Sequence, residues 1–100
     1  MSLSNQVAIV TGAGQGIGKA SALALAAAGA TIVAVDINES TLAETVAEVG
    51  KSGGRTLAIR ADLGSVKEID RLVGETMAAF GQVDILVNNA GVSGALTSWI

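Results

Sequence analysis

The chain has 100 residues, of which 50% are hydrophobic and 15% are charged, and its net charge is −3. This apolar content excludes a disordered or linker segment, and six scattered basic residues provide no surface for nucleic acid. The absence of cysteine and histidine excludes disulfides, thiol catalysis and the usual zinc ligands.

A membrane-spanning helix and a secretory leader are not expected either. Residues 20–35 are the most apolar stretch, but they are mostly alanine, are interrupted by Gly29 and fall short of the ~20 residues that a spanning helix needs. The first basic residue is Lys19, and a strand-like run precedes it, which does not fit a leader peptide. We therefore expect no membrane interaction and a cytoplasmic protein.

The first predicted elements are a strand and a helix. The β-branched run over Val7–Thr11 is typical of a strand that is buried on both faces. Small helix formers predict a helix over Gly16–Ala28, which Gly29 ends. Apolar residues at three- and four-residue spacing predict its buried face: Ile17, Ala20, Ala24, Leu25 and Ala28.

A second strand and helix follow in the same pattern. Thr31–Val35 is a continuous apolar run that ends at Asp36, and Asn38 is a candidate N-cap for the next helix. The expected inward residues of that helix are Leu42, Thr45, Val46 and Val49. The glycines in residues 50–54 then break the pattern.

The third unit predicts a strand over Arg55–Ala61, a helix and a fourth strand over Val83–Val87. Ser65 and Glu68 have the spacing of a capping box at the start of the helix, which Gly81 ends. The apolar stripe of this helix consists of Ile69, Leu72, Val73, Thr76, Met77 and Phe80.

Strands that alternate with helices at this spacing predict an α/β fold of the Rossmann type. The doubly wound sheet would be parallel, with right-handed crossovers and helices on both faces, and the chain would hold its first four strands and three helices. Residues 92–100 contain no finished element, and a terminal fourth strand would leave an unpaired edge. We expect residues 1–100 to form one dinucleotide-binding portion that is incomplete at its C-terminus.

The strongest local motif is the segment from Thr11 to Gly18, which reads TGAGQGIG between the first strand and the first helix. Glycine at position 12 permits a tight turn, at 16 lets the backbone approach a pyrophosphate, and at 18 lets the helix pack close to the strand. The free N–H groups of the first helical turn would point at the phosphates. A glycine-rich turn without a ligand is the alternative interpretation.

Asp36 is the second candidate for contact with a dinucleotide. It ends the second strand, 18 residues after Gly18, where a carboxylate accepts hydrogen bonds from both hydroxyls of a ribose. A loop acid or a charge at the start of a helix is the alternative. Because this carboxylate would repel a 2′-phosphate, and Gln15 and Ile37 place no cation beside it, we expect NAD rather than NADP as the cofactor. We expect the Lys19 side chain to be solvated.

Two further motifs complete a family pattern. Thr11 to Gly18 resembles the Thr-Gly-x-x-x-Gly-x-Gly motif of the short-chain dehydrogenase/reductase family. Asp62-Leu63 after the third strand and Asn88-Asn89-Ala90-Gly91 after the fourth are similar to that family's next two landmarks, in the same order. The resemblance covers essentially the whole chain.

The resemblance implies roles for individual residues. Asp62 would hydrogen-bond the adenine edge, and Leu63 would line its pocket. Gln15, Ile17 and the glycines at 12, 16 and 18 would surround the pyrophosphate, while Asn89, Ala90 and Gly91 would follow the adenosine and ribose. Asp62 as a residue that merely precedes a helix remains an alternative. For Asn88 we expect a structural role, in which it satisfies backbone groups of the sheet.

The resemblance also implies a reaction, namely hydride transfer between NAD(H) and an alcohol or ketone. Family members use a Tyr-x-x-x-Lys pair and a serine, but this chain has no tyrosine, so we assign it no catalytic residue. Ser93 and Ser98 are explained by loop polarity. The complete enzyme would be a homo-oligomer, and its substrate could resemble that of 3-oxoacyl-carrier-protein reductases or of sugar, steroid or polyol dehydrogenases.

Two other functions compete with this interpretation. The missing tyrosine is consistent with a non-catalytic half-domain that binds a nucleotide or pairs with another chain. A P-loop protein is suggested by the near match that ends at Gly18-Lys19, but Ala13 replaces the required first glycine and Ala20 replaces the magnesium-binding hydroxyl.

Overall fold

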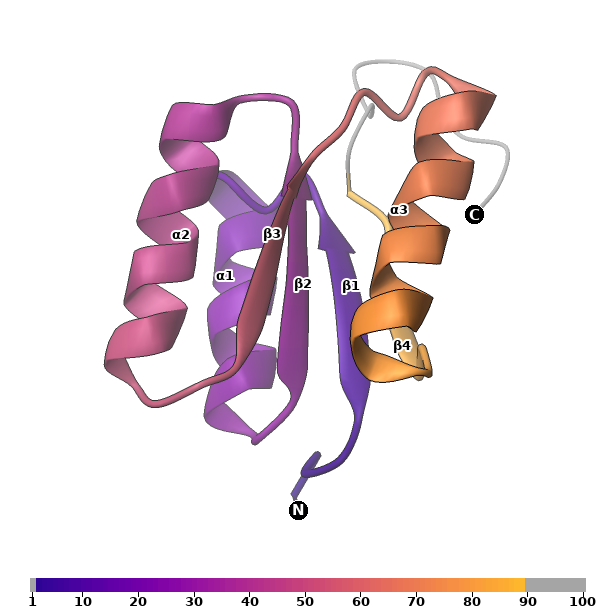
Figure 1. Cartoon of the computed structure of the whole chain (residues 1–100). Coiled ribbons are helices and arrows are strands. Elements are labelled where there is room, and N and C mark those ends of the chain that lie inside the picture. Colours follow the sequence, from indigo (N-terminus) through magenta and orange to yellow (C-terminus); the bar gives the residue numbers. More distant parts are fainter. Residues whose placement is uncertain (1, 90–100) are drawn as a thin grey trace.

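Seven elements alternate along residues 2–89, the part of the chain that the computed structural model describes (Figure 1). The strands are β1 (Val7–Thr11), β2 (Thr31–Asp36), β3 (Thr56–Arg60) and β4 (Ile85–Val87). The helices are α1 (Gly16–Ala27), α2 (Glu39–Lys51) and α3 (Val66–Phe80). The predicted α/β fold and the order of its elements are confirmed, with boundaries that differ by one or two residues.

The four strands form one parallel sheet in the order β3-β2-β1-β4. The chain builds outward from β1 to β3 and then crosses back to place β4 on the other side of β1. Helices α1 and α2 cover one face of the sheet, and α3 covers the other (Figure 1). The strand order therefore reverses between β1 and β4, and ligands of open α/β sheets bind beyond the carboxyl ends of the strands at such a point.

Each central strand contributes side chains to two cores, which explains its continuous apolar sequence. Alternate residues of β1 and β2 face α1 and α2, and those between them face α3. The first core contains Ala8, Val10, Ile32 and Ala34, and the second contains Val7, Ile9, Val33 and Val35.

The predicted inner face of α1 is only partly correct: Leu25 packs against the core, but three of the other predicted positions are exposed. Ile17 is 74% exposed, and Ala20 and Ala24 are exposed as well, whereas Gly18 and Ala22 are buried. The helix lies so close to the sheet that its smallest residues must face inward. An alanine-rich helix has almost no amphipathic pattern from which this orientation could be read.

The starts of the other two helices differ from each other. The Asn38 side chain accepts the Thr41 N–H at 3.1 Å, which confirms the predicted cap of α2. The capping box predicted for α3 does not form, because the Ser65 side chain makes no cap hydrogen bond. Glu68 instead accepts the Asp62 N–H at 3.3 Å and pairs with Arg71 at 3.1 Å. Hydrogen bonds from the Arg71 guanidinium lower the pKa of Glu68.

Helix α3 and strand β4 retain exposed apolar surface. Leu72 and Thr76 are buried, but Val73 and Met77, which were predicted to share their stripe, are 45% and 46% exposed. Strand β4 is shorter than predicted, and Leu86 in its centre is 59% exposed. Within residues 2–89, no helix combines the length and the hydropathy that crossing a membrane requires.

Two substitutions on α3 test this packing. Leu72→Ala should lower the free energy of unfolding by about 2–5 kcal/mol, because it leaves a cavity in the core between α3 and the sheet. Val73→Ala, at the exposed next position, should change it by less than about 0.5 kcal/mol. Urea unfolding followed by circular dichroism measures both, and equal losses would contradict this burial.

Candidate functional site

The glycine turn after β1 needs glycine for two different reasons. Gly12 and Gly16 have φ angles of 63° and 60°, in the left-handed region that other residues rarely adopt. A Cβ at Gly18 would overlap the carbonyl oxygen of Gly12, so the helix contacts the turn directly. Among the described residues, no atom lies within 4 Å of where a Cβ at Gly16 would stand, so this part of the chain leaves the start of α1 open to a ligand.

Gly14 is a site residue that the sequence analysis missed. Its N–H donates to the Asp36 Oδ2 atom at 2.8 Å, and a Cβ at this position would overlap the Thr41 hydroxyl. The turn therefore contacts both the end of β2 and the first turn of α2. The only sequence signal was a fourth glycine, which the family pattern leaves unspecified.

Asp36 is half-buried at the end of β2 and already holds two backbone donors. Its Oδ2 atom accepts the Gly14 N–H, and its Oδ1 atom accepts the Asn38 N–H at 3.0 Å. A carboxylate oxygen has two lone pairs, so each oxygen can accept one further donor, such as a ribose hydroxyl. Asp36 thus positions the glycine turn beside the place predicted for the ribose.

A buried threonine of α2 also supports the turn. The Thr45 hydroxyl is fully buried and donates to the Ala13 carbonyl at 2.8 Å. Helical spacing assigned Thr45 to the core but did not show which carbonyl it would meet. A hydroxyl inside an otherwise apolar stripe is the signal that points to such a partner.

The loop after β4 lies against the same turn. The Thr11 hydroxyl accepts the Asn89 N–H at 2.8 Å and lies 3.2 Å from the Asn88 Oδ1 atom. The Asn88 side chain thus contacts a side-chain hydroxyl of β1, whereas the prediction was that it satisfies backbone groups of the sheet. A Cβ at Gly18 would stand 3.0 Å from the Asn89 side-chain nitrogen, so the two motifs are adjacent. The predicted contacts of Ala90 and Gly91 fall outside the described residues.

Asp62 and Leu63, after β3, are engaged locally. The Asp62 Oδ1 atom accepts the Gly64 N–H at 2.9 Å, which closes a short turn before α3. Leu63 is half-buried and packs against the core beneath α3. The Asp62 contact agrees with the structural alternative given for Asp62, and the adenine contacts of Asp62 and Leu63 stay predictions.

The side chains around the start of α1 divide into open and engaged groups. Gln15 is the N-cap residue, makes no side-chain cap bond and is exposed, as is Ile17. Lys19 is not free in solvent as expected, because its ammonium pairs with Glu48 of α2 at 2.9 Å. The first turn of α1 has no acidic residue, so the positive end of its dipole is available to an anion.

The sequence analysis also overlooked a basic residue on the strand next to Asp36. In the parallel register of β2 and β3, Arg60 lies directly opposite Asp36. The sequence analysis considered only the chain neighbours of Asp36, whereas strand pairing brings the backbone of Arg60 beside it from 24 positions away. Arg60 therefore enters any account of how the site treats a 2′-phosphate.

The support that Thr45 provides can be measured. Thr45→Val should lower the free energy of unfolding by about 1–3 kcal/mol, because the Ala13 carbonyl loses its buried donor. Thr76→Val is a matched control, since that buried hydroxyl bonds Leu72, a carbonyl of its own helix, at 2.9 Å. Urea titrations of both variants should show the larger loss for Thr45→Val, and the opposite order would contradict its role.

Known proteins are similar to this chain in sequence. The (2S)-((R)-hydroxy(phenyl)methyl)succinyl-CoA dehydrogenase subunit BbsD of Thauera aromatica is 43% identical over 95 residues, covering 95% of this chain and 38% of that protein. A 3-oxoacyl-(acyl-carrier-protein) reductase of Synechocystis is 46% identical over 93 residues, covering 92% of this chain and 38% of that protein.

Solved structures of dehydrogenases and oxidoreductases superimpose on this chain. A 7α-hydroxysteroid dehydrogenase, complexed with NADH and 7-oxo glycochenodeoxycholic acid, superimposes with a TM-score of 0.89 and 44% identity, covering 93% of this chain and 36% of that one. A metagenomic short-chain oxidoreductase in complex with NADP superimposes with a TM-score of 0.87 and 40% identity, covering 92% of this chain and 42% of that one. The chain thus spans well under half the length of each protein. Since the family model described as short chain dehydrogenase also matches residues 6–98, the chain belongs to the short-chain dehydrogenase family.

Proposed function

We propose that this chain is the cofactor-binding portion of an oxidoreductase that transfers hydride between NAD(H) and an alcohol or ketone. The observation that carries the proposal is the glycine turn at the start of α1, open at Gly16 and held by the Asp36 carboxylate. Open N–H groups beside a carboxylate suit a dinucleotide, which presents a pyrophosphate and a ribose diol a short distance apart.

The residues of the site fit the parts of such a cofactor. The pyrophosphate would lie against Gly12, Gln15, Gly16, Ile17 and Gly18, and the adenosine ribose against Asp36. Asp62 and Leu63 are proposed for the adenine, and Asn89, Ala90 and Gly91 for the adenosine and ribose. When bound, the nicotinamide ring supplies the hydride donor or acceptor.

The proton that accompanies the hydride needs a separate acid or base. The chain has no tyrosine and no histidine, and we assign this step to no residue of it. Since the chain covers 38% of two curated relatives, we propose that the acid–base group belongs to a longer protein. In this chain, the residues around the turn bind and orient the cofactor.

Asp36 supports a preference for NAD over NADP. Two backbone N–H groups hold its carboxylate in place, so it would meet a 2′-phosphate with like charge instead of turning away. NADP is the second candidate, favoured by Arg60 in register with Asp36 and by the relative solved with NADP. The two charges make opposite contributions to 2′-phosphate binding, which makes the choice measurable.

Calorimetric titration tests the cofactor preference. NAD should bind this chain more tightly than NADP by about tenfold or more, the effect expected from a nearby like charge. The double variant Asp36→Ala with Ile37→Arg should reverse the order, and Arg60→Gln should weaken only NADP. Tighter NADP binding by the unmodified chain, lost in Arg60→Gln, would establish the second candidate.

A folded, monomeric sample that binds neither nucleotide would contradict the proposal. Circular dichroism and light scattering on the same sample distinguish that result from a failure to fold. That result would leave one hypothesis, namely a non-catalytic half-domain that pairs with another polypeptide and binds no nucleotide.

A further inference from the structure

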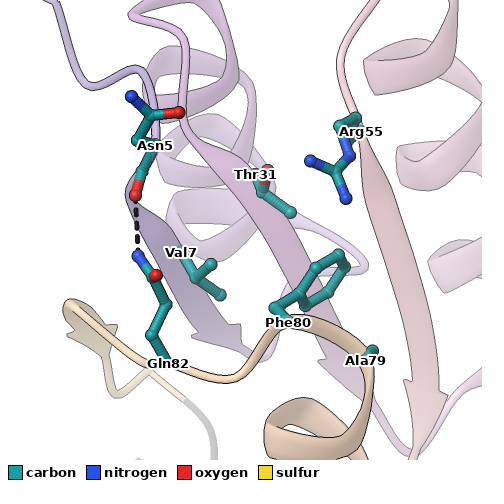
Figure 2. A pocket seen from close by; sticks show the side chains of 7 residues that line it. All are labelled: Asn5, Val7, Thr31, Arg55, Ala79, Phe80 and Gln82. Atoms are coloured by element: carbon teal, nitrogen blue, oxygen red, sulfur yellow. Dashed lines mark hydrogen bonds between the residues drawn. The ribbon is translucent and has the colours of Figure 1, made fainter.

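A cavity of about 210 Å³ lies at the opposite end of the sheet from the glycine turn (Figure 2). It is formed where β1 and β2 begin, just before β3, and where α3 ends. Its lining residues are Asn5, Val7, Thr31, Arg55, Ala79, Phe80 and Gln82. Since all strands are parallel, their amino ends meet at this edge and their carboxyl ends at the other.

Arg55 supplies the charge of this cavity. Its guanidinium lies over the ring of Phe80, 5.4 Å from the ring centroid, and the two side chains face each other in Figure 2. Within residues 2–89, the ion pairs are formed by Lys19 and Arg71, and none involves Arg55. A guanidinium has five N–H donors in a planar fork, so Arg55 can still bind a carboxylate with two parallel hydrogen bonds.

The opposite wall is held in place by hydrogen bonds. The Gln82 Nε2 atom donates to the Asn5 carbonyl and to the Asp84 Oδ2 atom, both at 2.6 Å. The same Asp84 oxygen accepts the Val7 N–H at 2.8 Å. The nearby negative charge is thus already engaged by two donors of the protein, and Asp84 does not line the cavity.

The volume and the lining of the cavity limit what can bind. A cavity of ~150 Å³ can accommodate benzene, so about 210 Å³ leaves room for one ring and a small polar group. Most of the lining is polar, with Arg55 at one side, and Val7, Ala79 and Phe80 contribute the apolar part. We propose that this cavity binds a small planar carboxylate, with its charge on Arg55 and its apolar part against Val7, Ala79 and Phe80.

Benzoate is a suitable probe, and binding to the 100-residue chain can be followed by amide shifts in two-dimensional NMR. Benzoate should shift the amides of Thr31, Arg55 and Gln82 in a saturable, millimolar titration. Arg55→Gln should weaken binding by about tenfold or more, as expected when a charge-assisted, two-point hydrogen bond is lost. Lys67→Gln removes one positive charge near the start of α3 and should leave the affinity unchanged.

Ligand controls separate the possible causes of a shift. Benzamide has the same shape without the charge and should bind more weakly than benzoate. Inorganic phosphate should not compete, because it has no apolar plane. Equal binding of benzamide, equal binding by Arg55→Gln, or benzoate shifts centred on Gly16 and Asp36 would each overturn the proposal. If Arg55→Gln fails to fold, Arg55→Lys keeps the charge without the planar fork and should still weaken binding.

Discussion

The close contact between Gly18 and the carbonyl oxygen of Gly12 determines where the first helix stands, and the rest of the site depends on it. No side chain fits between helix and turn, so α1 begins directly beyond the carboxyl end of β1. The same approach turns Gly18 and Ala22 toward the sheet and leaves Ile17 outside. A Cβ at position 18 would push the helix away from the turn and so move its first N–H groups.

Two elements then hold the turn in one conformation. Asp36 of β2 accepts the Gly14 N–H, and Thr45 of α2 donates to the Ala13 carbonyl. Because these groups are buried or half-buried, each would lose a partner if the turn moved. The turn is therefore ordered before any ligand arrives, which reduces the entropy cost of binding.

The two edges of the parallel sheet have different chemistry. The carboxyl ends gather the glycine turn, Asp36 and the loop after β4, whereas the amino ends gather Arg55 and Phe80 around a separate cavity. Both sites follow from the crossover connections, which bring all strand starts to one edge. Arg55 precedes β3 and lines the cavity, whereas Arg60 ends the same strand in register with Asp36.

Short-range patterns in the sequence determined the strands, the helices, the glycine turn and the Asn38 cap, because each depends on backbone preferences within a few residues. Tertiary structure alone decided which side of α1 is buried, since an alanine-rich helix has no marked apolar face. It also decided that Glu68 bonds Arg71 and Asp62 rather than closing a capping box. The partners of Thr45 and the position of Arg60 depend on packing and strand register between distant segments, which no local pattern encodes.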